Sequence, residues 1–288
     1  MIIAVLLVLG ICFGSFVNAL VWRLHEQEVT QEKLDAAKSG AAKSKLQTRL
    51  KDLSISKGRS MCVDCSHTLD WFDLIPVLSW LSVGGKCRYC RKPISWQYPV
   101  VEVLTAVLFV VAYIYWPLTL NSLGIFNLAV WLICVVAFMA LSIYDFRWMI
   151  LPNVIVYPLI LLTLVQRVVD TFVYHQGVHA LFLSLAASFV GGGIFYILYQ
   201  LSDGNWIGGG DVKLGFALGL LVGMPLQGLL LLFLSSLIGL VGAVPNIVKK
   251  GVHKNLQIPF GPCLMLACAI LVLFGDNTVA WYTRLLIG

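Results

Sequence analysis

The feature that most constrains this chain is a series of apolar runs, most of them long enough to cross a lipid bilayer as helices. Hydrophobic residues make up 59% of the 288 positions, charged residues make up 12%, and the mean hydropathy is +0.89. This composition excludes an ordinary soluble domain. It predicts an all-α, polytopic membrane protein with about eight transmembrane helices. The runs cover residues 2–24, 99–118, 124–143, 154–170, 178–200, 212–223, 226–246 and 259–275.

Two of these runs need a separate interpretation. The run at 212–223 is short and rich in glycine, so it predicts a helix that is tilted, broken or fused to the next run. The run at 2–24 has no basic segment before it and is long enough to serve as an anchor. We therefore expect the first helix to be retained.

The Lys and Arg residues favour one side of the membrane. When eight helices alternate across the bilayer, only Arg167 and Arg284 of the 20 basic residues fall on the side opposite to segment 25–98. Loops rich in Lys and Arg stay in the cytoplasm. The distribution predicts a cytoplasmic 25–98 segment with both chain termini outside. The net charge of +6 then reflects these loops, and it indicates no nucleic-acid partner.

The soluble segment divides the chain into three parts: a first transmembrane helix at 1–24, a cytoplasmic segment at 25–98, and a transmembrane core at 99–288. Up to about residue 60 the segment is rich in Ala, Lys and Glu, which is typical of a solvated helix or a flexible arm. Beyond that point it carries cysteines and aromatic residues.

Four of these cysteines have the spacing of a metal site. Cys62 and Cys65 form one CxxC pair, and Cys87 and Cys90 form a second. Four thiolates in two such pairs can surround one tetrahedral Zn²⁺ ion and leave no open position for chemistry. Two disulfides are the alternative, but disulfides rarely persist in a reducing cytosol. The pattern favours a structural zinc site in a small cytoplasmic domain that depends on the metal for much of its folding free energy.

Ionisable side chains at membrane depth are functional candidates because they are costly to bury there. The candidates are Asp145, Asp211, Glu102 and His179. Each has an ordinary explanation when taken alone: Asp211 could cap a helix, and Asp145 could pair with Arg147. The predicted topology changes the interpretation, because two helices separate the aspartates and both therefore reach the same side of the membrane.

A facing pair of carboxylates has a specific chemistry. At a separation of about 4 Å and an effective dielectric of about 20, two negative charges repel by roughly 4 kcal/mol, so the pair holds one proton near neutral pH. The ionised member can take a proton from water while the protonated member binds a peptide carbonyl oxygen. Gly208, Gly209 and Gly210, which precede Asp211, would let an extended substrate backbone approach closely. These features predict an aspartic protease.

The chain also resembles a known family in an ordered set of motifs: "GICFGSFVNALVWRL", the two CxxC pairs, "IPVLSWLSVGGKCRYC", "YPVVE", "YDFRWMILPN", "IGGGDVKL" and "IPFGPCLMLA". It is similar to the type IV prepilin peptidases. The resemblance implies a GxGD aspartic endopeptidase in the bacterial inner membrane that cleaves the leader of prepilins and pseudopilins after a glycine. It also implies N-methylation of the new terminus with S-adenosylmethionine. On this chain it assigns catalysis to Asp145 and Asp211, and zinc binding to the four cysteines named above.

The chain departs from the family pattern in two places. Asn153 follows Leu-Pro where many members have Asp, and the 25–60 stretch is longer than expected. Presenilin-like proteases share part of the aspartate pattern, but they carry Pro-Ala-Leu where this chain has Pro-Phe-Gly-Pro at 259–262. A proton- or cation-coupled transporter or scaffold with a structural zinc knuckle is the alternative from another class. The sequence makes no prediction about oligomeric state.

Overall fold

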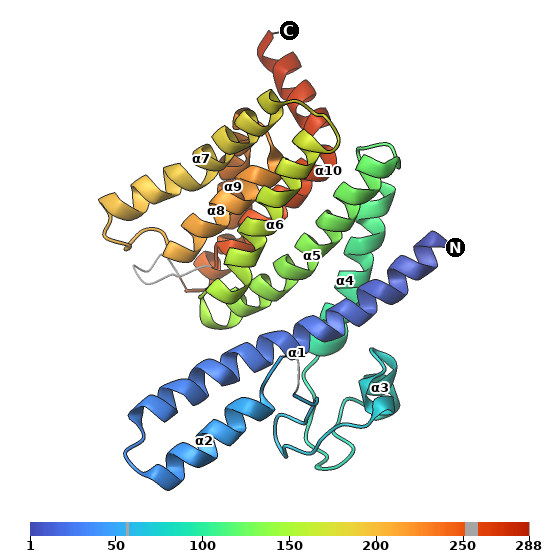
Figure 1. Cartoon of the computed structure of the whole chain (residues 1–288), viewed down its shortest axis with the longest axis vertical. Coiled ribbons are helices and arrows are strands. Elements are labelled where there is room, and N and C mark those ends of the chain that lie inside the picture. The colour runs from blue at the N-terminus through green and yellow to red at the C-terminus, as the bar shows by residue number, and fades with distance from the viewer. Residues whose placement is uncertain (56–57, 251–258, 288) are drawn as a thin grey trace. The chain divides into compact units, whose positions relative to one another are not determined.

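The computed structural model describes residues 1–55, 58–250 and 259–287, and the regular structure of this part is helical apart from two isolated β-bridges (Figure 1). The elements are α1 (Ile2–Ala36), α2 (Gly40–Asp52), the short 3-10 helix η1 (Trp71–Leu74), α3 (Leu78–Ser82), α4 (Gln97–Ile114), α5 (Ser122–Trp148), α6 (Asn153–Phe172), α7 (Val178–Leu201), α8 (Gly209–Val222), α9 (Pro225–Lys250) and α10 (Gly261–Ile287).

The all-α, multi-pass expectation is confirmed. Within the described residues six helices are long and apolar enough to cross a membrane, namely α1, α4, α5, α6, α7 and α9. The remaining two apolar runs are also helical. The run at 212–223 forms α8, which has only 14 residues. Within the run at 259–275, Gly261–Gly275 form a shorter apolar helical stretch, which is the first part of α10.

Helix α1 does not end with its apolar run at residue 24. It continues to Ala36, because residues 25–36 contain no Gly or Pro and consist mostly of good helix formers. Its 35 residues span about 50 Å. Ser39 then begins α2 by accepting a hydrogen bond from the N–H of Ala42. Of the two interpretations of the 25–60 stretch, the helical one describes residues 25–36 and 40–52.

The chain forms two compact units, Met1–Val111 and Ala112–Gly288. In the first unit, α1 and α4 pack closely because Gly10 and Gly14 present no side chain to α4. A Cβ on Gly14 would lie 2.6 Å from the Cα of Glu102, and a Cβ on Gly10 would overlap the backbone of Ala106. This glycine spacing is a common way for membrane helices to approach one another.

Arg23 ties the polar end of α1 to the chain that follows α2. Its guanidinium donates hydrogen bonds of 2.9–3.2 Å to the carbonyls of Ser54, Ile55 and Gly58, and only 7% of the residue is exposed.

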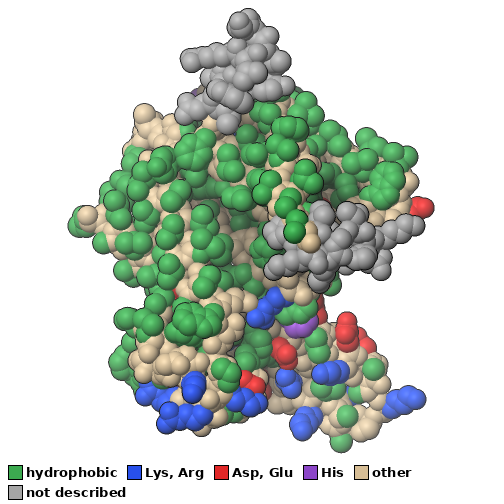
Figure 2. All heavy atoms as spheres, turned by 180° about the vertical axis from the view of Figure 1, so that it is seen from behind, with side chains coloured by type: hydrophobic (Ala, Val, Ile, Leu, Met, Phe, Trp, Pro, Cys, Tyr) green, Lys and Arg blue, Asp and Glu red, His purple; other side chains and the backbone are tan. Residues whose placement is uncertain are grey.

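In the face shown in Figure 2, Lys and Arg side chains gather over the first unit, whereas hydrophobic side chains cover the helices of the second.

In the second unit the short helix α8 lies at the centre and packs against α6, α7, α9 and α10. Glycines allow this close packing. A Cβ on Gly215 would lie 2.9 Å from the carbonyl oxygen of Gly191 in α7, and one on Gly219 would lie 2.5 Å from that of Ala187. The helix that begins beside Asp211 is therefore held by backbone contact along its length.

The far end of α8 is held by Arg167 of α6. The guanidinium donates from Nε to the carbonyl of Leu220 at 2.8 Å and from Nη2 to that of Leu221 at 2.6 Å. Asp170 lies 3.7 Å from the same guanidinium. A cation at the C-terminus of a helix satisfies its free carbonyls and complements the helix dipole. Arg167, one of the two basic residues that depart from the charge bias in the sequence, thus binds the C-terminal carbonyls of α8.

Candidate active site and metal centre

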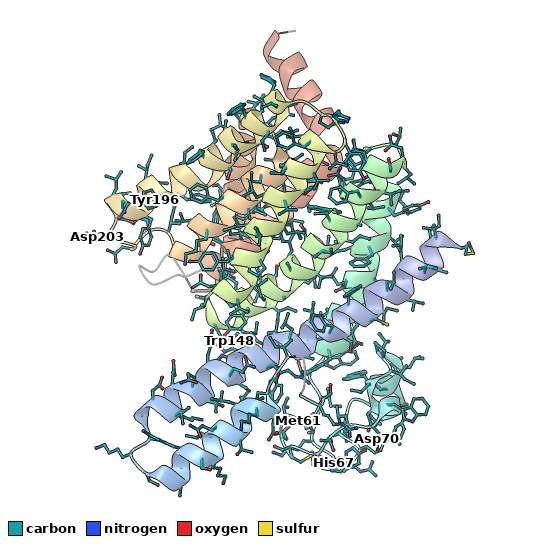
Figure 3. The ribbon with its side chains drawn as sticks, viewed as in Figure 1. Met61, His67, Asp70, Trp148, Tyr196 and Asp203 are labelled. Atoms are coloured by element: carbon teal, nitrogen blue, oxygen red, sulfur yellow. The ribbon has the colours of Figure 1, made fainter. Side chains whose placement is uncertain are left out.

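Asp145 lies in the last turn of α5, which ends at Trp148 (Figure 3). Met149 terminates the helix in the left-handed conformation, at φ 54°. The Asp145 residue is 5% exposed, and its Oδ2 accepts a 3.0 Å hydrogen bond from the N–H of Gly261, which begins α10. The N-terminus of a helix has free N–H groups and a positive dipole end, so it favours a carboxylate at this position.

Any side chain at position 261 would crowd the carboxylate of Asp145. A Cβ there would lie 2.8 Å from Oδ2 of Asp145 and 3.3 Å from Cδ2 of Leu151. Sequence reasoning assigned Gly261 no role in the site, although the turn signal Pro-Phe-Gly-Pro marks it as the start of a helix. This signal could have pointed to a helix N-terminus, but it carries no information on which carboxylate that N-terminus would meet.

Asp211 occupies the first turn of α8, three residues after the N-cap Gly208. Its carboxylate interacts with the backbone of Gly208, and a Cβ on Gly208 would lie 3.3 Å from Oδ2. A carboxylate at this helix position commonly satisfies the N–H of the cap residue. Asp211 is therefore not the N-cap that the sequence left open as its ordinary role; the N-cap is Gly208, and Asp211 interacts with it from the first turn.

The other two glycines of the segment have different neighbours. A Cβ on Gly210 would lie 2.9 Å from the Cβ of Leu151, so its absence lets the start of α8 pack against the turn between α5 and α6. A Cβ on Gly209 would lie 3.7 Å from the ring of Tyr199, which is ordinary contact. Gly210 thus has a packing reason to be glycine, whereas Gly209 has none in the described residues.

The two aspartates lie close enough for their charges to interact. Leu151 lies beside both Gly210, which precedes Asp211, and Gly261, whose N–H binds Asp145. Cys263, in the first turn of α10, lies near both carboxylates. The structure therefore brings together the pair that topology predicted from residues 66 positions apart.

The alternative ion pair between Asp145 and Arg147 is not formed in the described part of the chain. The Arg147 guanidinium instead lies 5.6 Å from the ring centroid of Trp148. Nearby, Nζ of Lys213 donates to Oδ1 of Asn153 at 2.8 Å and lies 5.2 Å from the ring centroid of Tyr157. Asn153 thus accepts from a cation at the position where the family often has a carboxylate.

The four predicted zinc ligands form one cluster in the first unit. The sulfurs of Cys62, Cys65, Cys87 and Cys90 all lie within 4.8 Å of one another, and Cys62 Sγ lies 3.9 Å from Cys90 Sγ. Sulfurs bound to one tetrahedral zinc at about 2.3 Å are about 3.8 Å apart, whereas a disulfide needs about 2.05 Å. All four thiols are free. The cluster fits a metal ion and not a pair of disulfides.

The two halves of the cluster share one backbone design. The residues that follow the second cysteine of each pair, Ser66 and Arg91, have φ values of 56° and 61°. Each donates its N–H at 2.9 Å to the carbonyl of the first cysteine of its pair. The isolated bridges Met61↔Thr68 and Lys86↔Pro93 flank these turns (Figure 3 labels Met61).

The thiols differ in their readiness to ionise. Backbone N–H groups of Cys90 and Tyr89 lower the pKa of Cys87 to about 7. Burial raises the pKa of Cys62 to about 12. Zinc binds thiolates, so a bound cation would supply the free energy that ionises the less acidic thiols. Across the cluster Lys92 pairs with Asp64 at 2.9 Å, an exposed contact of small energetic value.

Comparisons with known proteins show which family the chain resembles. Residues 131–244 match the model of the type IV leader peptidase family, and residues 8–116 match the bacterial peptidase A24 N-terminal domain. A prepilin leader peptidase/N-methyltransferase of Aeromonas salmonicida strain A449 is 33% identical over 276 residues, covering 95% of this chain and 91% of that protein. Another protein of this name, from Xanthomonas campestris pv. campestris, is 32% identical over 284 residues, covering 96% and 92%.

A type 4 prepilin-like proteins leader peptide-processing enzyme of Escherichia coli O78:H11 is 33% identical over 261 residues, covering 89% of this chain and 88% of that protein. No solved structure matches the chain.

Proposed function

Because this chain belongs to the type IV leader peptidase family, we propose that Asp145 and Asp211 form the catalytic pair of a membrane-embedded aspartic endopeptidase. The observation that carries this proposal is the meeting of the two carboxylates at the ends of two helices in one compact unit. The substrates are prepilins or pseudopilins, whose leader is cleaved after a glycine.

The proposed reaction uses a single proton held by the pair. The ionised carboxylate takes a proton from a water molecule as its oxygen attacks the scissile carbonyl carbon, and the protonated carboxyl hydrogen-bonds the carbonyl oxygen. Return of a proton to the peptide nitrogen then breaks the C–N bond. Within this scheme Gly261 holds Oδ2 of Asp145 through its N–H, and the Gly208 backbone orients Asp211.

The substrate backbone would approach along the glycines before Asp211. Peptide hydrolysis needs an extended, unpaired segment, and residues without Cβ atoms let such a segment form main-chain hydrogen bonds. Gly208 adjoins Asp211, and Gly209 has only ring contact with Tyr199, so these two positions suit a substrate strand. Gly210 serves the same segment indirectly, by seating it on Leu151.

A second activity, N-methylation of the new terminus with S-adenosylmethionine as methyl donor, is proposed from the names of the relatives. The four-cysteine cluster would hold a structural Zn²⁺ ion in the domain at 25–98, since four thiolates close the coordination sphere. When processed substrate is examined by mass spectrometry, an added methyl group is expected. An unmodified terminus in the presence of S-adenosylmethionine would limit the enzyme to proteolysis.

The proposed topology has eight membrane helices, counting α8 and the apolar part of α10, in the bacterial inner membrane. The basic 25–98 segment and the active site would face the cytoplasm, with both termini outside. This arrangement lets cytoplasmic leaders reach the pair without crossing the bilayer.

The experiment that tests the catalytic pair is cleavage of a full-length prepilin by purified Asp145→Asn and Asp211→Asn variants. Each is expected to lose at least about a hundredfold in rate, because neither can complete the proton transfers. The matched control is Asp203→Asn, which changes an exposed aspartate in the loop between α7 and α8 (Figure 3). Wild-type rates in either dyad variant would overturn the assignment and favour the transporter or scaffold alternative.

A further inference from the structure

The chain between the two cysteine pairs exposes large hydrophobic side chains. It contains η1 and α3, and within it Trp71 is 77% exposed, Leu78 is 63% exposed and Leu81 is 60% exposed. Side chains of this size are seldom so exposed together unless they meet a partner or a membrane. We refer to residues 71–83 as the apolar loop.

The charged group of the apolar loop points away from these residues. Asp73 accepts a 3.1 Å hydrogen bond from Nε of Arg88 and a 3.0 Å hydrogen bond from the hydroxyl of Tyr89, both in the second cysteine pair. Its side chain is only 9% exposed. The loop therefore turns its carboxylate inward to the cysteine cluster and its apolar side chains outward, which is the amphipathic pattern of interfacial segments.

Glu102 places the apolar loop beside a membrane helix. This residue of α4 is 5% exposed, and its Oε2 accepts a 2.7 Å hydrogen bond from the N–H of Val77, next to Leu78. Ser15 of α1 hydrogen-bonds the same carboxylate. Glu102 lies five residues after Gln97, the first residue of α4, and α4 is long and apolar enough to cross a bilayer. The loop thus lies level with the first turns of a membrane-spanning helix.

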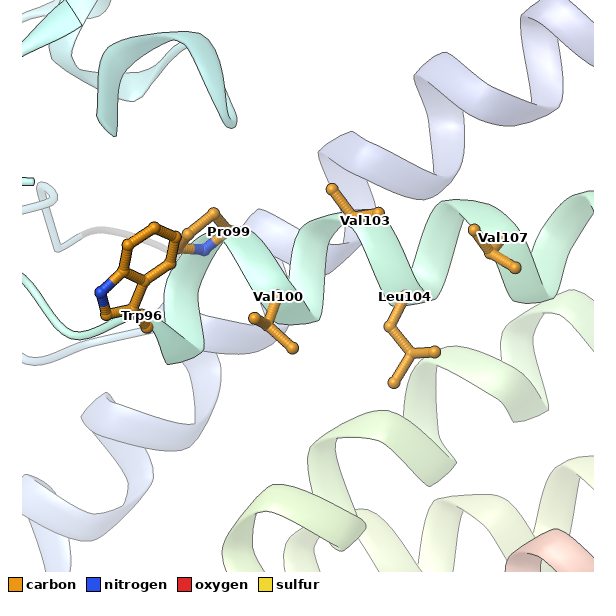
Figure 4. Close-up of a pocket in the computed structure, with 6 residues that line it drawn as sticks. All are labelled: Trp96, Pro99, Val100, Val103, Leu104 and Val107. Carbon is orange, nitrogen blue, oxygen red and sulfur yellow. The ribbon is translucent and has the colours of Figure 1, made fainter. Parts of the chain in front are cut away.

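An exposed face of α4 continues this apolar surface. Trp96, Val100, Leu104 and Val107 recur at helical spacing and, with Pro99 and Val103, line a groove of about 410 Å³ (Figure 4). Trp96 is 69% exposed, and its ring centroid lies 4.2 Å from that of Trp80 in α3. The groove on the membrane helix and the apolar loop are therefore joined through two tryptophans.

We propose that the apolar loop is a membrane anchor that inserts into the boundary between phospholipid headgroups and acyl chains. The partner is lipid because the loop continues the surface of a helix that already crosses the bilayer, and because tryptophan is enriched at that depth. A bilayer also accepts outward-facing Leu and Trp side chains without a shaped binding site. The anchor would hold the cysteine domain against the membrane surface, with Glu102 setting its depth.

The test measures the depth of the loop in the intact protein. A fluorescent noncanonical amino acid is placed at Leu81, or at Val63 as the control, because Val63 is 52% exposed in the first cysteine pair and outside the loop. Each protein is reconstituted in vesicles of phosphatidylcholine and phosphatidylglycerol whose acyl chains are brominated near the headgroup. Quenching is expected to be several-fold stronger at position 81 than at position 63, and equal quenching at both positions would overturn the proposal.

A second experiment distinguishes contacts with lipid from contacts with protein. A photo-crosslinking residue at position 81 should form mainly phospholipid adducts, and crosslinks mainly to the same chain or to a second copy would overturn the proposal.

A third experiment tests the role of Glu102. Glu102→Ala should reduce quenching at position 81, whereas Glu102→Gln, which keeps an acceptor oxygen, should retain it. Zinc content serves as the folding control, because the cysteine cluster does not involve Glu102. Unchanged quenching in Glu102→Ala would refute the role of Glu102 in setting the depth.

Discussion

Gly261→Ala tests whether the amide at the start of α10 positions the proposed catalytic pair. The added Cβ would lie 2.8 Å from Oδ2 of Asp145, so the carboxylate must move by about 0.6 Å to reach an ordinary contact of about 3.4 Å. The Gly261 N–H···Oδ2 distance, now 3.0 Å, would lengthen to about 3.6 Å, beyond the range of a hydrogen bond.

The expected loss follows from that bond. A hydrogen bond to a charged group contributes about 1.5–3 kcal/mol, which corresponds to roughly a 10-fold to 150-fold lower rate if the whole contribution is lost from the transition state. The assay is the initial rate of cleavage of a full-length prepilin by purified enzyme in lipid. Thermal stability is measured alongside, so that a fall in rate can be separated from unfolding.

The control is Gly193→Ala in α7, where an added Cβ meets no atom within 4 Å. It should keep the wild-type rate and gain slightly in stability, because Ala favours the helix. The reasoning is refuted if Gly261→Ala cleaves at the wild-type rate, or if Gly193→Ala loses as much activity as Gly261→Ala does.

Three other substitutions test the cysteine cluster, the packing of α1 against α4, and the interaction of Arg167 with the end of α8. Replacing Cys62 and Cys87 together by Ser should abolish binding of about one zinc per chain, measured by metal analysis of purified protein; stoichiometric zinc in that variant would contradict the assignment. Gly14→Leu should lower the thermal midpoint, because its Cβ alone would lie 2.6 Å from the Cα of Glu102 in α4; an unchanged midpoint would show that the two helices do not depend on this contact. Arg167→Met should destabilise the protein by about 1–3 kcal/mol, since two carbonyls of α8 lose their donor; urea unfolding in detergent that showed no change would refute the capping role.

Much of the fold could be predicted from local patterns in the sequence. Apolar runs of sufficient length located the six helices that can cross a membrane, since a helix in lipid satisfies its own backbone and needs only an apolar surface. The paired CxxC spacing located the metal cluster for a similar reason, because each pair brings two sulfurs to one side of a tight turn. The sequence was less informative where the apolar pattern stopped, as at residue 24, where strong helix formers carry α1 on to Ala36.

The candidate site was only partly predictable. Counting helices predicts the two aspartates on one membrane face, and in the structure they lie close enough for their charges to interact. Their supports could not be found in this way. Gly261 donates to a carboxylate 116 residues away, and Leu151 separates two glycines that are distant in sequence. No short-range pattern encodes such contacts.

The amino-acid sequence by itself thus determined the helical membrane class and the cysteine cluster, because each depends on local composition or spacing. Only the tertiary structure shows which backbone group each buried charged side chain binds. Asp145 meets the start of α10, Arg167 meets the end of α8, and Glu102 meets the apolar loop. The physical reason is that a buried charge needs a partner, and packing of helices at glycine contacts selects which backbone amide or carbonyl comes within reach.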